Sequence, residues 1–188
     1  MTTANQRRIM EALHTKTVID PAQEVAFRVQ FLQDYLLSSG RNSFVLSISG
    51  GQDSALAGRL CQLAVEELRT RTGKDYLFLA LRLPYGIQWD EADAERALEF
   101  IAPDTIYTIN IQPAVDRAIA SFEQATGFSM TDYNKGNQKA QECMTVHYRF
   151  AHQFNVLVVG TDHAAEAVVG FFTKYGDGGV DLTPVLAT

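Results

Sequence analysis

The stretch that decides the fold is Ser49-Gly50-Gly51-Gln52-Asp53-Ser54, which lies between an apolar run at residues 43–48 and a helix-like run at residues 55–68. The apolar run has the composition of a buried strand. Two adjacent glycines let the backbone turn tightly and approach a bound group closely. The N–H groups of the next helix then point at that group, and the helix dipole favours an anion there. This stretch therefore predicts a phosphate-binding loop.

The side chains of the loop refine this prediction. The hydroxyls of Ser49 and Ser54 can add donors, whereas a carboxylate at Asp53 repels phosphate and is better suited to holding a metal ion that bridges to it. The loop is not G-x-x-x-x-G-K-[ST], because no lysine follows Gly51, and the spacing also excludes G-x-G-x-x-G. The structural alternative is an ordinary glycine turn capped by Asp53 or Ser54.

Composition narrows the class of protein. With 188 residues, the chain is long enough for one domain with a sizeable core, and we predict a single domain over residues 1–188. The formal net charge of −6 and the lack of a Lys/Arg cluster disfavour nucleic-acid binding. We expect a cytoplasmic protein without a membrane span, since residues 1–16 are polar and no apolar run is long enough. Cys61 and Cys143 are expected to be reduced, buried thiols.

Strand-like and helix-like runs alternate along the chain. The strand-like runs are 44–48, 76–81, 105–109 and 156–159, and the helix-like runs between them are 55–71, 91–101, 112–125 and 136–154. This order predicts an α/β fold, a doubly wound, Rossmann-like parallel sheet with helices on both faces. Ligands of such sheets bind at the carboxyl ends of the strands. We therefore expect segments 49–54, 82–88 and 160–166, which each follow a strand, to converge on one rim.

An earlier helix is predicted at residues 21–38, with Asp20 as N-cap and Pro21 in its first turn. It has two apolar stripes, one made of Val25, Val29, Leu32 and Leu36 and the other of Phe27, Phe31 and Tyr35. Two apolar faces predict burial on two sides, either within the fold or against a partner chain.

Several segments carry a resemblance to known proteins. The S-G-G-x-D-S loop resembles the signature of the N-type ATP pyrophosphatases, which have an adenine nucleotide alpha hydrolase-like fold and split ATP into AMP and pyrophosphate. Four further segments are R-L-P-Y-G-I-Q at 82–88, N-K-G-N at 134–137, V-G-T-D-H-A-A-E-A at 159–167 and G-F-F-T-K-Y-G-D-G-G at 170–179. Together they resemble the ammonia-dependent NAD synthetases over nearly the whole chain.

This resemblance implies a C–N bond-forming ligase. The nicotinate carboxylate of deamido-NAD (nicotinic acid adenine dinucleotide) would attack the α-phosphate of ATP, and ammonia would then displace AMP to give NAD. Adenylation supplies the leaving group that a carboxylate lacks, and backbone donors with Mg²⁺ would stabilise the departing pyrophosphate. The resemblance also implies a homodimer with deamido-NAD at the subunit interface. No amidotransferase domain is visible, so free ammonia is the expected nitrogen donor.

The resemblance also assigns roles to residues. The implied ATP contacts are Ser47, Ile48, Ser49, Gly50, Gly51, Gln52, Asp53, Ser54, Arg82, Gln88 and Thr161, and the implied Mg²⁺ ligands are Asp53 and Glu166. The implied deamido-NAD contacts are Gln141, Lys174 and Asp181. Asp177 is the implied catalytic residue, which would hold ammonium and help to deprotonate it.

Each of these assignments has a structural alternative. Glu166 could be a solvated helix charge, Arg82 a surface ion pair and Asp177 a turn residue. His163 could serve as a helix N-cap or orient Asp162, without chemistry of its own. His147 is expected to belong to a helical stripe rather than to a metal site.

The chain departs from the family pattern at two places. Gln141 and Cys143 stand where the family has arginines, and a neutral amide is a weaker partner for a phosphate or carboxylate than a guanidinium. Family members also continue beyond the position of Thr188, with an ATP-contacting lysine and a loop that closes over the site. Two other functions therefore stay open: an ATP pyrophosphatase acting on another acid, such as a GMP synthetase-like or tRNA-modifying enzyme, and a degenerate nucleotide-binding relative.

Overall fold

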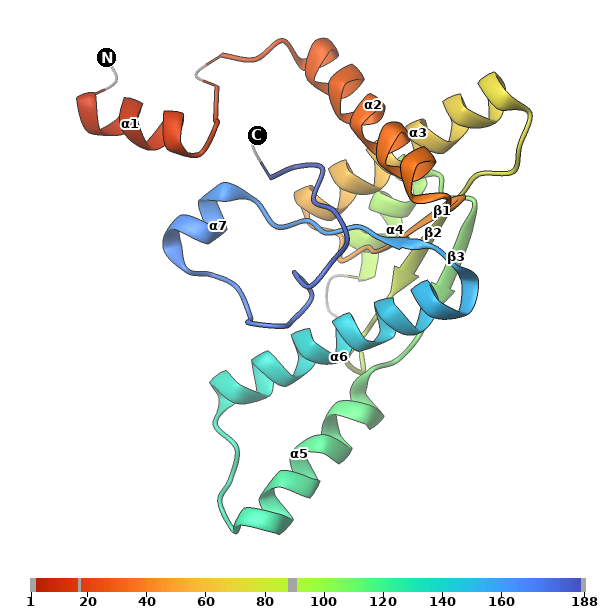
Figure 1. Cartoon of the computed structure of the whole chain (residues 1–188). Helices are drawn as coiled ribbons and strands as arrows, with labels where there is room; N and C mark the ends of the chain where they lie inside the picture. The colour runs from red at the N-terminus through yellow and green to blue at the C-terminus, as the bar shows by residue number, and fades with distance from the viewer. Residues whose placement is uncertain (1–2, 17, 88–90, 187–188) are drawn as a thin grey trace.

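A parallel sheet forms the centre of the molecule (Figure 1). The computed structural model describes residues 3–16, 18–87 and 91–186. In these residues the sheet has the order β3-β2-β1-β4, made of β1 (Ser43–Ser47), β2 (Leu77–Arg82), β3 (Thr105–Thr108) and β4 (Leu157–Val158). Every pairing is parallel, and β1 lies between β2 and β4. The predicted doubly wound α/β fold is confirmed.

Helices cover both faces of this sheet. The helices of the described residues are α1 (Ala4–Ala12), α2 (Pro21–Ser39), α3 (Gln52–Thr72), α4 (Glu91–Ile101), α5 (Gln112–Thr126), α6 (Asp132–Phe154) and α7 (Ala164–Val169), of which α1 has no buried residue and lies away from the sheet. Figure 1 shows α2 and α3 on one side of the sheet and α6, with α5 beside it, on the other. None of the helices within the described ranges is both long and apolar enough to span a bilayer.

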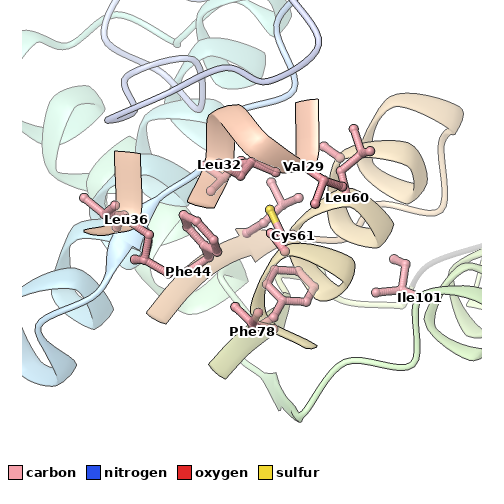
Figure 2. Packing of buried hydrophobic residues seen from close by; sticks show 14 of the residues in the cluster. Val29, Leu32, Leu36, Phe44, Leu60, Cys61, Phe78 and Ile101 are labelled. Carbon is pink, nitrogen blue, oxygen red and sulfur yellow. The ribbon is translucent and has the colours of Figure 1, made fainter. Parts of the chain in front are cut away.

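Alternate side chains of the strands build two cores. Phe44 and Leu46 of β1 and Phe78 of β2 pack with α2, α3 and α4 (Figure 2). Val45 of β1 and Leu79 of β2 point the other way and pack with α5 and α6. Because side chains alternate across a strand, strands covered on both faces are apolar throughout, which explains the continuous apolar runs in the sequence.

Both cysteines are free thiols, one inside a core and one beside a core. Cys61 is buried and packs in the first core, and Cys143 is half-buried beside the second. Burial raises the pKa of the Cys61 thiol well above its usual range. The pKa of Cys143 is raised to about 12, first by burial and then by the negative charges of Asp177 and Glu142.

Several boundaries differ from those predicted. Helix α6 begins at Asp132 rather than at residue 136, and Thr131 caps it by accepting a 3.3 Å hydrogen bond from the Asn134 N–H. This first turn is polar and solvent-facing, so it lacks the apolar period on which the prediction relied. Helix α3 likewise starts at Gln52, inside the segment of residues 49–54, which we call the glycine loop. The short helices α1 and α7 were not predicted.

Helix α2 has one buried and one exposed apolar face. Asp20 caps it as predicted, since its carboxylate accepts hydrogen bonds from the N–H groups of Ala22 and Gln23. The buried side chains of the first stripe are Val29, Leu32 and Leu36. Phe27 of the second stripe is 68% exposed. Within the described part of the chain, the fold therefore buries the first stripe from Val29 onward, while Val25 at its start is 38% exposed.

The buried His147 of α6 predicts a pH dependence of stability. Its side chain is 2% exposed, and neither ring nitrogen has a hydrogen-bond partner among the described residues. Burial lowers the pKa of His147 to about 4 because the charged ring would lose its hydration. The unfolded state therefore binds more protons than the folded state below the ordinary histidine pKa, and stability is lost as the pH falls toward 4. We expect the free energy of unfolding to drop by about 2 kcal/mol from pH 8 to pH 5 through this residue.

Urea unfolding of His147→Leu at both pH values checks this expectation. The variant should lose about 2 kcal/mol less than the wild-type protein between the two pH values. Exposed His152 on the same helix supplies the control, and His152→Leu should behave like the wild-type protein. Equal pH dependence in all three proteins would contradict the expectation.

Candidate active site

The glycine loop joins β1 to α3 and is held in shape by its serines. The Ser54 hydroxyl is buried, accepts a 3.3 Å hydrogen bond from the Ser49 N–H and donates a 3.1 Å bond to the Gly51 carbonyl. The Gly51 N–H donates to the Ser49 hydroxyl at 3.2 Å. The hydroxyls expected as phosphate donors are thus bonded within the loop. The side chain of Ile48 lies in the core, so at this position only the backbone can face a ligand.

The backbone of the loop requires glycine and leaves donors open. Gly50 has φ 95°, and a Cβ on it would lie 2.8 Å from the backbone nitrogen of Ala94 in α4. Gly51 is the N-cap of α3 and forms no side-chain cap hydrogen bond. The first N–H groups of α3 therefore lack the usual cap acceptor and are available to an anion. This arrangement supports the predicted phosphate loop over the alternative of a capped turn.

Two carboxylates from different strand ends meet beside the loop. Asp53 lies in the first turn of α3, and Glu166 lies in α7, which follows β4. His163 stands between them, with Nε2 3.8 Å from Asp53 Oδ2 and 3.9 Å from Glu166 Oε2. Its Nδ1 accepts the Glu166 N–H at 3.4 Å, so the ring also caps α7. The sequence indicated this cap, but only the fold places the ring between the two acids.

The donor set of Asp53 and Glu166 fits Mg²⁺. Their side chains stay partly open, at 54% and 31% exposure, and both offer hard oxygen ligands. Among the described residues, no group of three or more His, Cys, Asp or Glu side chains could hold a metal ion by itself. Mg²⁺ commonly uses only one or two carboxylates and completes its shell with water and phosphate oxygens. The two acids beside a phosphate loop suit that mode of binding.

A hollow of about 440 Å³ opens next to these carboxylates, and we call it the acidic hollow. Its walls include Thr161, Asp162, Glu166 and Asp177. The pKa of Asp177 is raised, first by loss of hydration and then by the charge of Glu166. The pKa of Asp162 is raised by loss of hydration and then by Asp177 and Glu166. These acids repel one another, so a cation in the hollow would be stabilised.

A second hollow of about 410 Å³ adjoins the first and contains two of the predicted substrate contacts, Gln141 and Lys174. We call it the polar hollow. The residues common to both hollows are Tyr133, Asn137, Phe172 and Thr173. Between them, the Thr173 hydroxyl donates a 2.8 Å hydrogen bond to Asn137 Oδ1. The two hollows therefore form one extended surface from Glu166 to Gln141.

The remaining predicted residues lie apart from this surface or outside the described chain. Arg82 ends β2, is buried and pairs with Glu91 of α4 at 2.9 Å, so it is not a surface ion pair. Asp181 accepts the Val158 N–H at 2.8 Å and the Tyr148 hydroxyl at 3.3 Å, away from both hollows. Its contact with deamido-NAD stays a prediction. Gln88 lies outside the described residues.

A parallel α/β sheet with a glycine loop and facing acids at its rim defines a nucleotide-binding protein of the doubly wound class. Comparison with known families identifies the family of this chain. The model of the NAD synthase family matches residues 24–187, and the chain belongs to that family.

Individual relatives agree with this placement. The chain is 56% identical to the NH₃-dependent NAD⁺ synthetase of Exiguobacterium sp. (strain ATCC BAA-1283 / AT1b), over 96% of this chain and 66% of the relative. It is 58% identical to that of Deinococcus radiodurans, over 94% of this chain and 61% of the relative. The chain thus spans about two thirds or less of the length of these curated relatives.

Solved structures give the same result. The NAD⁺ synthetase of Burkholderia pseudomallei superposes with a TM-score of 0.87 at 46% identity, covering 97% of this chain and 68% of that one. The NMN synthetase of Francisella tularensis superposes with a TM-score of 0.76 at 34% identity, covering 91% of this chain and 66% of that one.

The close approach of Gly50 to α4 predicts that substituting this glycine destabilises the loop. In Gly50→Ala the alanine would have to adopt a positive φ that is unfavourable for it. Its methyl group would also clash with the backbone of α4. We expect a loss of about 2–4 kcal/mol in the free energy of unfolding, together with weaker binding of Mg·ATP. Urea unfolding and calorimetric titration measure the two effects.

The matched control for this substitution is Gly127→Ala. Gly127 also has a positive φ, of 73°, but an added Cβ meets no atom within 4 Å. This variant should lose only about 1–2 kcal/mol and keep the nucleotide affinity of the wild-type protein. Equal effects of the two substitutions would show that contact with α4 does not constrain the loop.

Proposed function

We propose that this protein catalyses the ATP-dependent amidation of deamido-NAD with ammonia, giving NAD, AMP and pyrophosphate. The observation that carries the proposal is the meeting of Asp53 and Glu166 beside the glycine loop, at the edge of the acidic hollow that contains Asp177. This arrangement supports a site for a metal-bound phosphate next to a site for a cation. Membership of the NAD synthase family supports the assignment.

The glycine loop is the ATP end of the proposed site. The open N–H groups at the start of α3 would bind phosphate oxygens of ATP. Asp53 and Glu166 would hold Mg²⁺, and this ion would neutralise charge on the departing pyrophosphate when bound. Thr161 lies on the wall of the acidic hollow, where it can contact the same nucleotide.

The two hollows are the acid-substrate end of the proposed site. Lys174 and Gln141 in the polar hollow would contact deamido-NAD, while the acidic hollow would receive ammonium. Asp177, Asp162 and Glu166 create a negative field that attracts this cation. The carboxylate of Asp177 would then accept a proton and release ammonia for attack on the adenylate.

We also propose that the protein is a cytoplasmic homodimer. The exposed Phe27, Phe31 and Tyr35 face of α2 supports a contact with a second copy, because aromatic side chains are common in such contacts. Sedimentation of the wild-type protein and of Phe27→Asp tests the dimer. Loss of dimerisation in the variant is the expected result, and a wild-type monomer would contradict the proposal.

One assay tests the reaction itself. The protein is mixed with ATP, Mg²⁺ and ammonium, and with deamido-NAD or nicotinate mononucleotide, and the amidated product (NAD or NMN), AMP and pyrophosphate are quantified. We expect equal amounts of NAD, AMP and pyrophosphate with deamido-NAD. The mononucleotide is included because one solved relative is an NMN synthetase.

Other results of this assay would support other functions. Formation of AMP only with a different acid would indicate an ATP pyrophosphatase of another specificity. Binding of nucleotide without any AMP would indicate a degenerate relative. Activity with glutamine but none with ammonium would contradict the proposed nitrogen donor.

The neutral side chain of Gln141 leads us to expect weak binding of deamido-NAD. A guanidinium here would add a charge-assisted contact that strengthens binding by about 1.5–3 kcal/mol. We therefore expect Gln141→Arg to lower the KM for deamido-NAD by about ten- to a hundredfold. Steady-state kinetics at saturating ATP measure this change.

Gln138 lines the same polar hollow and serves as the control. Gln138→Arg adds the same charge at a position that the family resemblance does not implicate, and it should change KM much less. An unchanged KM in Gln141→Arg would contradict the interpretation of this residue.

A further inference from the structure

A buried arginine of α2, outside both hollows, contacts the segment that supports the acidic hollow. Arg28 is 8% exposed, and its Nη1 donates a hydrogen bond to the carbonyl of Pro184. Its Nη2 lies 3.3 Å from Glu24 Oε2 on the same helix, and Glu24 also pairs with Lys16. The guanidinium therefore links α2 to residues 180–186, which we call the strap.

The strap in turn holds the loop between β4 and α7, residues 160–164, which we call the site loop. The Gly160 N–H donates to the Leu182 carbonyl at 2.9 Å, and the Ala164 N–H donates to the Leu186 carbonyl at 3.0 Å. These two bonds stand on either side of Thr161, Asp162 and His163. Movement of the strap would therefore move the residues that line the acidic hollow and face Asp53.

The fit between strap and site loop is close. A Cβ on Gly160 would lie 2.6 Å from Cγ2 of Val180, so no larger residue could occupy this position without displacing the strap. Packed surfaces of this kind transmit a shift rather than absorb it. The geometry of the site loop thus depends on where the strap lies.

Arg28 contacts the strap between its two bonds to the site loop, since Pro184 lies between Leu182 and Leu186. A proline has no N–H, so its carbonyl is the polar backbone group through which it can be held. The Nε of Arg28 has no hydrogen-bond partner among the described residues. An unpaired buried donor costs stability, and an apolar side chain would avoid this cost. Packing alone therefore does not explain an arginine here.

A second contact from the same helix reaches the start of this region. The hydroxyl of Tyr35 donates a 3.3 Å hydrogen bond to the carbonyl of Asp181. Helix α2 therefore makes polar contacts with the strap at Asp181 and Pro184, beside the strap side chains Leu182 and Val185, which are buried in the first core. The core side chains Val29, Leu32 and Leu36 fix the helix against the sheet. The hydrogen bonds to Asp181 and Pro184 therefore attach the strap to a rigid helix.

We propose that Arg28 is a positioning residue for the proposed reaction: by holding Pro184, it places the site loop so that Thr161 and Asp162 line the acidic hollow and His163 faces Asp53. This inference rests on the proposed function for the roles of Thr161 and Asp53. The placement of the site loop by Arg28 is a separate statement, and it can be measured without catalysis.

The experiment uses the full chain with Arg28→Met, Arg28→Lys and a matched control. Arg59→Met is the control, because Arg59 also donates to a backbone carbonyl, that of Ile101 at 3.0 Å, but at the end of α4. Urea unfolding gives the stability of each variant. Amide hydrogen exchange at Gly160 and Ala164 reports the site loop, and calorimetric titration with Mg·ATP reports nucleotide binding, both at a temperature where every variant is folded.

We expect Arg28→Met to speed exchange at Gly160 and Ala164 by about tenfold and to weaken Mg·ATP binding by a similar factor. Arg28→Lys should restore part of both, since an ammonium can donate to the same carbonyl with a poorer fit. Arg59→Met should lower stability while leaving exchange at these two amides and nucleotide affinity unchanged. If Arg28→Met does not fold, Arg28→Lys supplies the same comparison.

The results distinguish the proposed role of Arg28 from the proposed function of the protein. Exchange at Gly160 and Ala164 that matches the Arg59→Met control would overturn the role of Arg28. Faster exchange with unchanged Mg·ATP affinity would also overturn it, because the site loop would then not matter to binding. Faster exchange in a protein whose wild type binds no Mg·ATP would support the placement of the site loop by Arg28 and contradict the proposed function.

Discussion

Burial of β1 on both faces is the constraint on which the rest of the structure depends. Phe44 and Leu46 pack into one core, Val45 packs into the other, and the backbone is paired on both edges with β2 and β4. Solvent therefore reaches this strand only at its ends. Polar and charged groups that must meet a ligand can lie only there, and the glycine loop follows the carboxyl end of β1.

The electrostatics of that rim follow from the same topology. Parallel strands end on one side, so Asp53 after β1 and the acids after β4 are brought close although they are far apart in the chain. Loss of hydration, and then repulsion between the carboxylates, raise the pKa values of Asp162 and Asp177. A site built in this way favours cations, and both a metal ion and ammonium are cations that the proposed reaction uses. The neutral Gln141 lies in the adjoining polar hollow.

Helix α2 connects the core to the rim. Val29, Leu32 and Leu36 of its first apolar stripe are buried, while Arg28 and Tyr35 reach the strap that supports the site loop. Its second stripe, with Phe27, is exposed. A partner seated on that stripe would contact the same helix that holds the strap. Assembly and site geometry would then share one element.

The local pattern of residues in the sequence by itself determined much of the secondary structure of this protein. The period of apolar residues predicted the sheet and helices, and the glycine pair with its serines and Asp53 predicted the phosphate loop, because turns and caps depend on neighbouring residues. Pattern did not predict the polar first turn of α6 or the short α7, which have little apolar period. Only the tertiary structure placed His163 between two acids, joined the two hollows through Thr173 and Asn137, and set Arg28 against Pro184. These contacts join residues distant in sequence, and no local preference encodes them, so packing around the buried sheet decides them.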